Sequence, residues 1–378
     1  MSWSVKLFRI RGIDIKVHLT FVLILVWAAY RWSAITGEGI QGALFGVVAI
    51  LLLFVAVTLH ELGHSFQALK FGVKVRDITL MPMGGLARLE EMPDKPEQEL
   101  RIAIAGPLVN FAIVAVLFAL GVLLQTRAVI SLQELYTSLG QVSWNGMLAY
   151  LTMANLVIGV FNLIPAYPMD GGRILRALLA MKIDYGKATS IAVSVGQGLA
   201  LLLGLWGFMS GTWTLVLIAI LVWMGASHEG RHVEAKSVLQ EFKVNQAMTR
   251  QPLTLKTDDT LARAVELTLS NAQADFPVVK DDKGELVGFL TEANLVKGLQ
   301  AHGGNFQVGE MMQTDVFTTD VDEPLFTVQQ RMASKRVQAA PVVDRDGRLV
   351  GLLTTTDINQ AYQLLSVHPQ LAPQASTS

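Results

Sequence analysis

The sequence predicts a polytopic α-helical membrane domain of about six spans, with a short β-hairpin element, followed by a cytosolic α/β domain. Of the 378 residues, 52% are hydrophobic and only 16% are charged. Apolar runs near the length that a bilayer requires lie at 17–35, 43–69, 102–125, 146–164, 188–209 and 212–227. After Ala226 the composition becomes polar and mixed, and an internal repeat follows. The chain therefore reads as a membrane part joined to a soluble part.

Charge indicates how the membrane part is oriented. Lysine and arginine concentrate in the segments 1–16, 70–101 and 173–187 and after residue 227, whereas the intervening segments carry only Arg127. By the positive-inside rule this predicts a multi-pass protein of the cell membrane with both termini cytoplasmic. A net charge of −1 without a dense basic run gives no support to nucleic-acid binding. The absence of cysteine excludes disulfides, thiolate metal sites and cysteine nucleophiles.

A His-Glu-x-x-His motif lies inside the second apolar run. His60 and His64 are four residues apart and so share one face of a helix, where both imidazoles can bind one metal ion. Glu61 lies about 100° round the same helix, within reach of a water molecule at that ion. The alternative is a pair of core histidines bonded to their neighbours. Because ionisable groups in an apolar segment are costly, they favour a functional site.

The same motif occurs a second time, from His228 to His232, just after the last apolar run. Arg231 between its histidines would be repelled by a dication, and Gly230 is a poor helix former. The second copy is therefore predicted to be a solvated segment at the membrane surface.

One glycine-containing segment lies between two apolar runs, and three amide side chains lie within the runs. Residues 73–89 alternate in polarity around Gly84 and Gly85, which favours a hairpin or an exposed strand edge, or else an ordinary loop. Asn110, after Gly106-Pro107, is interpreted as an interhelical hydrogen-bonding residue, as are Asn155 and Gln197.

The fourth apolar run ends in a segment rich in proline and glycine, from Asn162 to Arg173. Such a break within a membrane is tolerated around a protein-lined cavity. Asp170 precedes an amphipathic stretch, so it suits a helix N-cap, and it also suits the third ligand of a catalytic zinc ion. One carboxylate can serve both roles.

Together these motifs resemble the site-2 protease family of intramembrane zinc metalloproteases. The resemblance covers residues 1 to about 227 and rests on His60-Glu61-Leu62-Gly63-His64, Gly106-Pro107-x-x-Asn110 and Asn162-x-x-Pro165-x4-Asp170-Gly171. It implies one zinc ion per chain and hydrolysis of peptide bonds in single-span membrane protein substrates. It also implies that Asn162 orients the substrate or polarises its carbonyl, and that the 81–89 segment pairs with the unwound substrate.

The soluble part contains two copies of one sequence unit. Pro277-Val278-Val279 recurs as Pro341-Val342-Val343, and Thr291-x2-Asn294 recurs as Thr354-x2-Asp357. Each copy reads as strand, helix, strand, turn, strand, helix. The copies resemble a tandem CBS-domain pair, which implies a regulatory module. The resemblance places Thr354 and Asp357 at the phosphate and ribose positions of an adenine nucleotide, with Thr291 and Asn294 as their counterparts. A homodimerisation module that binds no nucleotide is the alternative.

The predicted organisation has four parts: the protease domain 1–227, a linker 228–242, the tandem CBS domains 243–366 (copies 243–300 and 307–366) and a disordered tail 367–378. The predicted function is that of an intramembrane zinc endopeptidase regulated by adenine nucleotide. A CBS-regulated transporter or channel is the alternative. It is less favoured because transporters commonly repeat their spans, and no repeat is found within 17–227.

Overall fold

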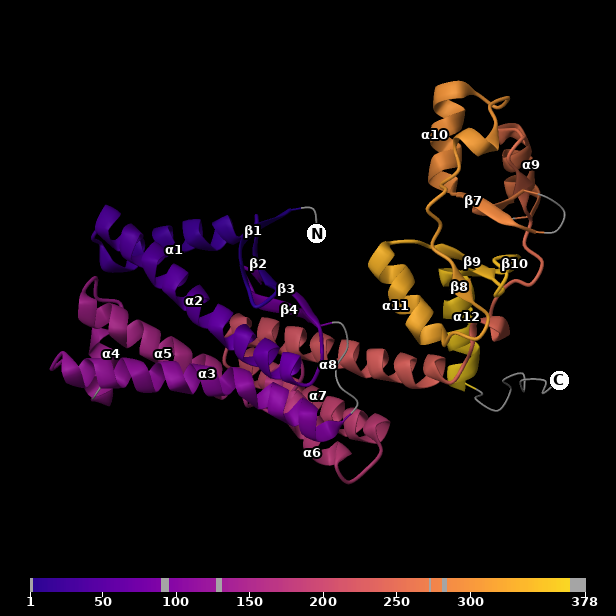
Figure 1. Ribbon diagram of the computed structural model, residues 1–378. Coiled ribbons are helices and arrows are strands. Elements are labelled where there is room, and N and C mark those ends of the chain that lie inside the picture. The colour runs from indigo at the N-terminus through magenta and orange to yellow at the C-terminus, as the bar shows by residue number, and fades with distance from the viewer. Residues whose placement is uncertain (1–2, 90–94, 127–130, 272, 281–283, 368–378) are drawn as a thin grey trace. The chain divides into compact units, whose positions relative to one another are not determined.

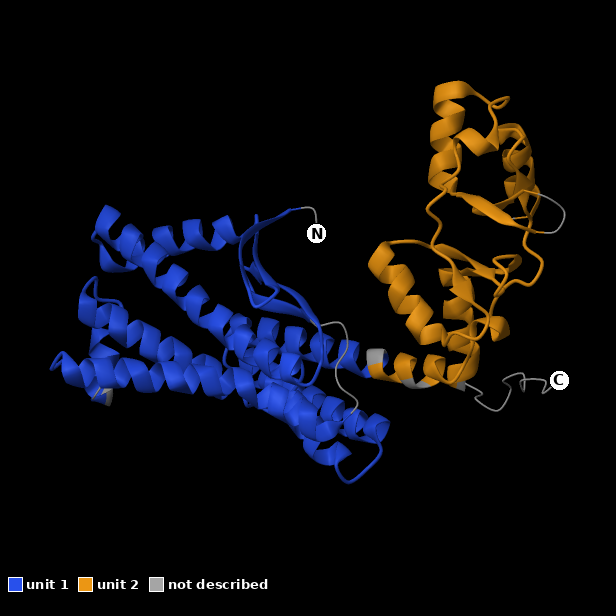
Figure 2. Cartoon of the chain, in the orientation of Figure 1, with its two compact units in different colours: residues 1–231 blue, residues 232–378 orange. Residues whose placement is uncertain are grey.

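The computed structural model describes residues 3–89, 95–126, 131–271, 273–280 and 284–367 (Figure 1). The turn of the first copy, predicted at 281–284, lies outside these residues except for Gly284. The predicted tail 367–378 also lies outside them except for Val367, which ends a helix. Contacts divide the chain into two compact units, residues 1–231 and 232–378 (Figure 2). The predicted linker 228–242 is helical for most of its length, because α8 runs from Trp213 to Gln240.

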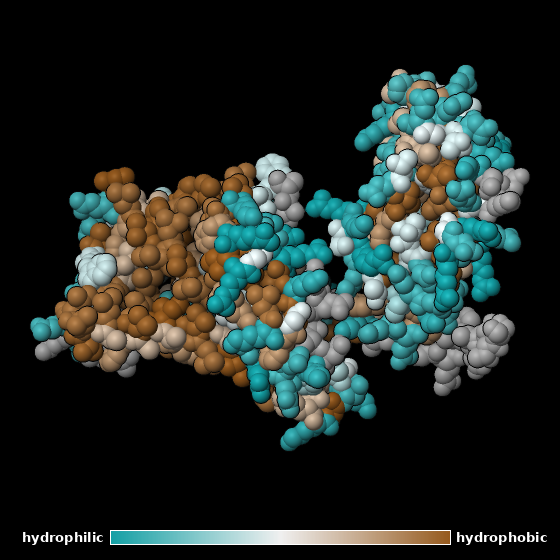
Figure 3. Space-filling model, viewed as in Figure 1, coloured by the Kyte–Doolittle hydropathy of each residue, from teal (hydrophilic) through white to brown (hydrophobic). Residues whose placement is uncertain are grey.

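The first unit is built from helices. In chain order they are α1 Phe21–Thr36, α2 Ile40–Lys70, α3 Pro96–Leu123, α4 Leu132–Ser138, α5 Trp144–Asn162, α6 Asp170–Ala180, α7 Tyr185–Met209 and α8. Among the described residues, α2, α3, α5, α7 and α8 are long and apolar enough to cross a membrane, whereas α1 has only 16 residues. The predicted count of six spans is therefore not confirmed. Hydrophobic residues cover much of the visible face of this unit, whereas the second unit is mostly hydrophilic (Figure 3).

The strands of the first unit form one four-stranded sheet in the order β1-β2-β3-β4. Its members are β1 Ser4–Ile10, β2 Ile13–His18, β3 Val75–Met81 and β4 Gly84–Leu89. The hairpin predicted within 73–89 is present as β3 and β4. The first apolar run was placed too early, because Val17 and His18 belong to β2 and the helix starts only at Phe21.

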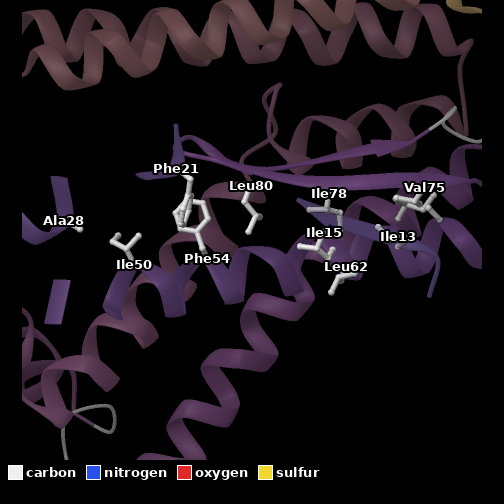
Figure 4. Packing of buried hydrophobic residues seen from close by; sticks show 12 residues of the cluster. Ile13, Ile15, Phe21, Ala28, Ile50, Phe54, Leu62, Val75, Ile78 and Leu80 are labelled. Atoms are coloured by element: carbon white, nitrogen blue, oxygen red, sulfur yellow. The ribbon is translucent and has the colours of Figure 1, made fainter. Parts of the chain in front are cut away.

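The sheet packs on α2 through a buried apolar cluster. Ile15 of β2 and Ile78 of β3 belong to the same cluster as Phe54 and Leu62 of α2 (Figure 4). Leu62 lies between the two histidines of the first motif copy, so this packing fixes the sheet beside that motif.

A buried carboxylate ties three strands of the sheet together. Asp77 of β3 accepts hydrogen bonds from Lys16 of β2 and Arg88 of β4, each at 2.9 Å. Burial alone would raise the pKa of Asp77, but these two cations outweigh it and hold that pKa below its ordinary value.

The second unit consists of two similar halves. The first half contains β5 Leu255–Lys256, α9 Leu261–Asn271, β6 Phe276–Val279, β7 Leu286–Leu290 and α10 Glu292–His302. The second half contains β8 Thr319–Asp320, α11 Leu325–Lys335, β9 Ala339–Val343, β10 Leu349–Thr354 and α12 Thr355–Val367. This is the predicted order of elements in each copy. The halves also pair reciprocally, Thr249 with Leu352 and Phe289 with Gln313, so they form one domain.

Candidate metal centre

Three side chains predicted to bind metal meet in the first unit. His60 and His64 lie on α2, and Asp170 is the first residue of α6. The Nε2 atoms of the two histidines are 3.1 Å apart, and Asp170 Oδ2 lies 3.3 Å from His60 Nε2 and 3.1 Å from His64 Nε2. Zinc bonds of 2.0–2.1 Å in a tetrahedron would place ligand atoms roughly 3.3 Å apart. The three donors therefore fit one zinc ion.

Hydrogen bonds on the far side of each ring determine which nitrogen faces the ion. His64 Nδ1 donates to the backbone carbonyl of Ile102 at 2.7 Å. His60 Nδ1 donates to Asn110 Oδ1 at 2.5 Å, while the amide of Asn110 donates to Asn155 Oδ1 at 2.9 Å. With Nδ1 carrying the proton, each neutral ring directs its Nε2 lone pair toward the other donors. Such outer partners fix the ring orientation and strengthen metal binding.

The structure excludes one alternative role for these residues and adds another. Asp170 is not the N-cap of α6, because Met169 holds that position, and the Asp170 carboxylate faces the histidines instead. Asn110 does bond across helices as predicted, but it also orients His60, a role that the sequence analysis did not assign. The available signal was a single amide within the apolar stretch from Ile102 to Leu124.

Gly106 of α3 gives the histidines their space. A Cβ atom at this position would lie 2.2 Å from His64 Nε2 and 2.7 Å from His60 Nε2. Any side chain at Gly106 would thus occupy the volume between the proposed ligands. This explains why the motif around Asn110 contains a glycine.

Glu61 belongs to the centre without being one of the three donors. Its carboxylate interacts electrostatically with both histidines and with Asp170. A Cβ atom on Gly85 of β4 would lie 2.7 Å from Glu61 Cγ, so the strand backbone passes directly beside this side chain. Glu61 therefore lies between the three donors and β4.

Asn162 lies at the end of α5 and is half-buried. Among the described residues, its side chain has no hydrogen-bond partner. Its polar atoms are thus available, and within the described residues no hydrogen bond joins them to the three donors.

The side chain of His232 lies outside the described residues, and none of the described side chains of the second copy belongs to the cluster of three donors. His228 is exposed, and Glu229 forms an ion pair with Arg176, in which the two side-chain atoms are 2.7 Å apart. The prediction of a solvated segment is therefore wrong for Glu229. Arg176 was counted among the loop charges of the segment 173–187, but it lies in α6 and only 2% of it is exposed.

In the second unit, the predicted nucleotide residues cap helices. Thr354 and Asp357 bond reciprocally at the start of α12: Thr354 N and Oγ1 both donate to Asp357 Oδ2 at 2.8 Å. Thr291 Oγ1 accepts from Asn294 N at 3.3 Å, and the Asn294 amide donates to the carbonyl of Met311 at 3.1 Å. A carboxylate could not donate that last bond, which gives a structural reason for Asn294 where the other copy has Asp357.

A pocket of about 250 Å³ also lies in the second unit. It is lined by Leu286, Val287, Thr314, Val316, Thr318, Val343 and Gly347. None of the four predicted nucleotide residues is among its lining residues.

Two histidines on one helix, a distant aspartate and a glutamate beside them define a zinc-peptidase type of site within an apolar helical unit. The chain belongs to Peptidase family M50, the site-2 proteases, and carries tandem CBS domains: the M50 model matches residues 48–203, and the CBS model matches residues 244–301 and 308–363.

Two similar proteins align with nearly the whole chain. The zinc metalloprotease MJ0392 of Methanocaldococcus jannaschii is 36% identical over 375 residues, which are 98% of this chain and 99% of that protein. The protein Rip3 of Mycobacterium tuberculosis is 29% identical over 398 aligned positions, covering 98% of this chain and 96% of that one. A solved site-2 protease from M. jannaschii is 44% identical, covers 61% of this chain and 96% of its own, and has a TM-score of 0.43. The chain is thus a zinc metalloprotease, and a CBS-regulated transporter or channel is not supported.

Proposed function

We propose that this chain is an intramembrane endopeptidase in which His60, His64 and Asp170 hold one zinc ion. The observation that carries the proposal is the convergence of three donor atoms within 4.8 Å of one another, from helices far apart in sequence. Zinc, when bound, lowers the pKa of water to roughly 7 and polarises a carbonyl group.

Glu61 is the general base in this proposal. It takes the proton of the attacking water and passes it to the leaving amine, a role that requires a carboxylate beside the metal ligands but not bound among them. Asn162 is proposed to donate a hydrogen bond to the carbonyl oxygen of the scissile bond. Its half-buried amide, without a partner among the described residues, supports this role.

The proposed substrates are single-span membrane proteins that bind in an extended form at β4. In the described sheet, β4 pairs only with β3, so its other edge can accept a further strand. Gly85 lies directly against Glu61. A peptide added at this edge would have its backbone near the proposed base, whereas a helical substrate would keep its peptide groups bonded internally.

Photo-crosslinking tests this proposal. A photoreactive residue at Leu86, an exposed position in β4, is combined with Glu61→Gln so that bound substrate is not cleaved. We expect captured single-span proteins that are cleaved when they are reconstituted with the wild-type enzyme. The matched control carries the photoreactive residue at Leu123, an exposed position at the end of α3. Equal capture at Leu123, or captured proteins that are never cleaved, would contradict the proposal.

We also propose that the CBS pair binds an adenine nucleotide that regulates cleavage. Asp357 accepts both hydrogen bonds from Thr354 through Oδ2, which leaves Oδ1 for a ribose hydroxyl at the start of α12. Thr354 lies beside it, and Thr291 and Asn294 occupy the matching place in the first copy. The hydrogen bond from Asn294 to Met311 already engages that amide, so the second copy is the better site.

Calorimetry with ATP on the full chain tests the nucleotide proposal. Asp357→Ala should abolish binding while leaving zinc content unchanged, and the control Asp344→Ala should bind as the wild type does. Asp344 accepts turn hydrogen bonds in the same copy, so it controls for loss of a carboxylate. Absence of ATP binding to the wild type at millimolar concentration would contradict the proposal and leave the CBS pair as a dimerisation module.

The proposed location is the cell membrane, with both termini cytoplasmic and a homodimer formed through the CBS pair. The chain contains no cysteine, so single engineered cysteines give clean labelling. Lys74→Cys, between α2 and β3, should react only with reagent on the cytoplasmic side, and Gln133→Cys in α4 only from the opposite side. The reverse pattern would contradict the orientation, and a monomeric mass in detergent would contradict the dimer.

A further inference from the structure

A second cluster of buried charges lies around Arg176 of α6. Its Nε and Nη2 atoms both donate to Oε1 of Glu99, with the Nε bond at 2.9 Å, and Nη1 donates to Oε1 of Glu229 at 2.7 Å. The guanidinium also lies 5.4 Å from the ring centre of Tyr167 and 4.9 Å from that of Tyr185. Glu99 is fully buried and Arg176 nearly so. The cluster thus joins α3, α6 and α8 through one side chain.

Arg176 and the proposed zinc ligand Asp170 lie on the same short helix. α6 has eleven residues and begins at Asp170, so Arg176 is six residues, or roughly 9 Å, further along its axis. A helix of this length moves as one body. Whatever fixes Arg176 therefore fixes the direction in which α6 presents Asp170.

One face of α8 contacts the chain on both sides of Asp170. Val222, Gly225, Ala226 and Glu229 follow the spacing of a single helix face. Val222 is in the buried cluster of Ala166 and Met169, and Ala226 is in that of Tyr167. A Cβ atom on Gly225 would lie 2.8 Å from Pro168 Cδ. The face thus packs on residues 166–169 before the ligand, and Glu229 bonds to Arg176 after it.

The cluster is poorly suited to serve stability alone. Glu99 Oε2 and the hydroxyl of Tyr167 are buried without a hydrogen-bond partner among the described residues. A buried ion pair with unsatisfied polar atoms contributes little net stability, but breaking it leaves an uncompensated charge. Its definite effect is to hold three helices in one arrangement.

We propose that Arg176 is a positioning residue for the metal centre, and that Glu229 fixes α6, and with it Asp170, to α8. The proposal rests on the zinc site proposed above. It also assigns a role to the glutamate of the second His-Glu-x-x-His copy. Since α8 continues to Gln240, beyond the boundary of the first unit, a displacement of α8 reaches Asp170 through this ion pair.

Zinc release from the purified, zinc-loaded full chain tests the proposal. With a chelator in excess, Glu229→Gln and Arg176→Met should release zinc about 10-fold faster than the wild type, at the lower end of the effect of losing a residue that bonds directly to a ligand, because they act on Asp170 through α6. Arg176→Lys should fall between, because it keeps the charge but not the forked donors. The controls Glu97→Gln and Arg101→Met change exposed residues on α3 and should stay within about 2-fold of the wild type.

A second background separates positioning from general loss of stability. In Asp170→Asn, adding Glu229→Gln should not accelerate zinc release further, although it should lower the melting temperature in both backgrounds. Equal acceleration in both backgrounds, or no acceleration by Glu229→Gln in the wild type, would overturn the positioning role. Glu229→Gln keeps this test available if Arg176→Met does not fold. Zinc retained by a His60→Ala/His64→Ala variant would instead overturn the proposed zinc site, and this role with it.

Discussion

The two copies of His-Glu-x-x-His have the same spacing and different surroundings. In the copy at His60 and His64, both rings are buried and each Nδ1 is held by an acceptor on α3. In the other copy, His228 is exposed and Glu229 forms an ion pair with an arginine. Gly106 provides space at the first copy, and Asp170 provides a third donor there.

This difference teaches that the spacing of two histidines is a necessary feature of such a site but not a sufficient one. A metal site also needs a third ligand and partners that fix each ring. In the first copy these come from α3 and α6, which are distant in sequence.

Removing the histidine pairs should give opposite results. The His60→Ala/His64→Ala variant should lose its zinc and all detectable cleavage, because two of three ligands are gone. The His228→Ala/His232→Ala variant should keep one zinc per chain and cleave substrate. Metal analysis and a cleavage assay on the same preparations measure both. Zinc loss from the second variant would mean that the metal site was assigned to the wrong copy.

The two glutamates should differ in what they change. Glu61→Gln should keep zinc but lower the cleavage rate by about 10²–10⁴-fold, the usual loss on removing a general base. At saturating zinc, Glu229→Gln should lower that rate by less than about 10-fold, since its proposed effect passes through a ligand. Equal losses of rate in the two variants would contradict the assignment of Glu61 as the base and Glu229 as a positioning residue.

The partner of His60 should matter more than a similar amide elsewhere. Asn110→Leu removes the acceptor of His60 Nδ1 and should weaken zinc affinity by about 10–100-fold. Gln197→Leu removes a bond of similar kind, the 3.1 Å bond to Ser227 between α7 and α8, and should leave zinc affinity unchanged. Competition with a chromophoric chelator measures both affinities. An unchanged zinc affinity in Asn110→Leu would mean that Asn110 contributes only to helix packing.

The smallest effect concerns the sheet, which flanks only the first copy. The pKa of Asp77 is lower in the folded chain than its ordinary value of 3.8, so its ion pairs stabilise the sheet fully above that value. That stabilisation should be lost as pH falls through the folded pKa. At pH 7, Asp77→Asn should destabilise the sheet by about 1–3 kcal/mol. Hydrogen exchange in β3 and β4 measures this, and unchanged exchange would contradict it.

Much of the architecture could be predicted because its signals are local. Helical spacing pairs His60 with His64, hydropathy places the long helices, and the repeat defines the second unit. The strands β1 and β2 were missed for different reasons. The alternation Ile13-Asp14-Ile15-Lys16-Val17 of β2 is short and its end was assigned to the first apolar run, whereas a bulge between Lys6 and Phe8 breaks the alternation of β1. Residues 1–16 therefore read only as a basic segment.

Long-range partners could not be predicted from the sequence. Asn110 looked like packing because its partner is fifty residues away on another helix. Arg176 resembled an ordinary loop cation, since nothing near it in sequence indicates that Glu99 and Glu229 surround it. Asp170 was predicted to be the third ligand and also to suit a helix N-cap, but its distance from His60 and His64 could not be derived from the sequence. In each case the deciding contact is a tertiary one.

The pairing of β2 with β3 has a consequence for how the chain inserts into a membrane. The two strands are parallel, with Asp14 opposite Asp77, and the chain between them consists mainly of α1 and α2. A chain that leaves one side of a bilayer and returns to the same sheet must cross an even number of times. If α2 crosses, α1 must cross as well, despite its 16 residues, which local thinning of the lipid can accommodate. In that case β2 can pair with β3 only after both α1 and α2 have crossed, and the pairing then holds the two crossings together.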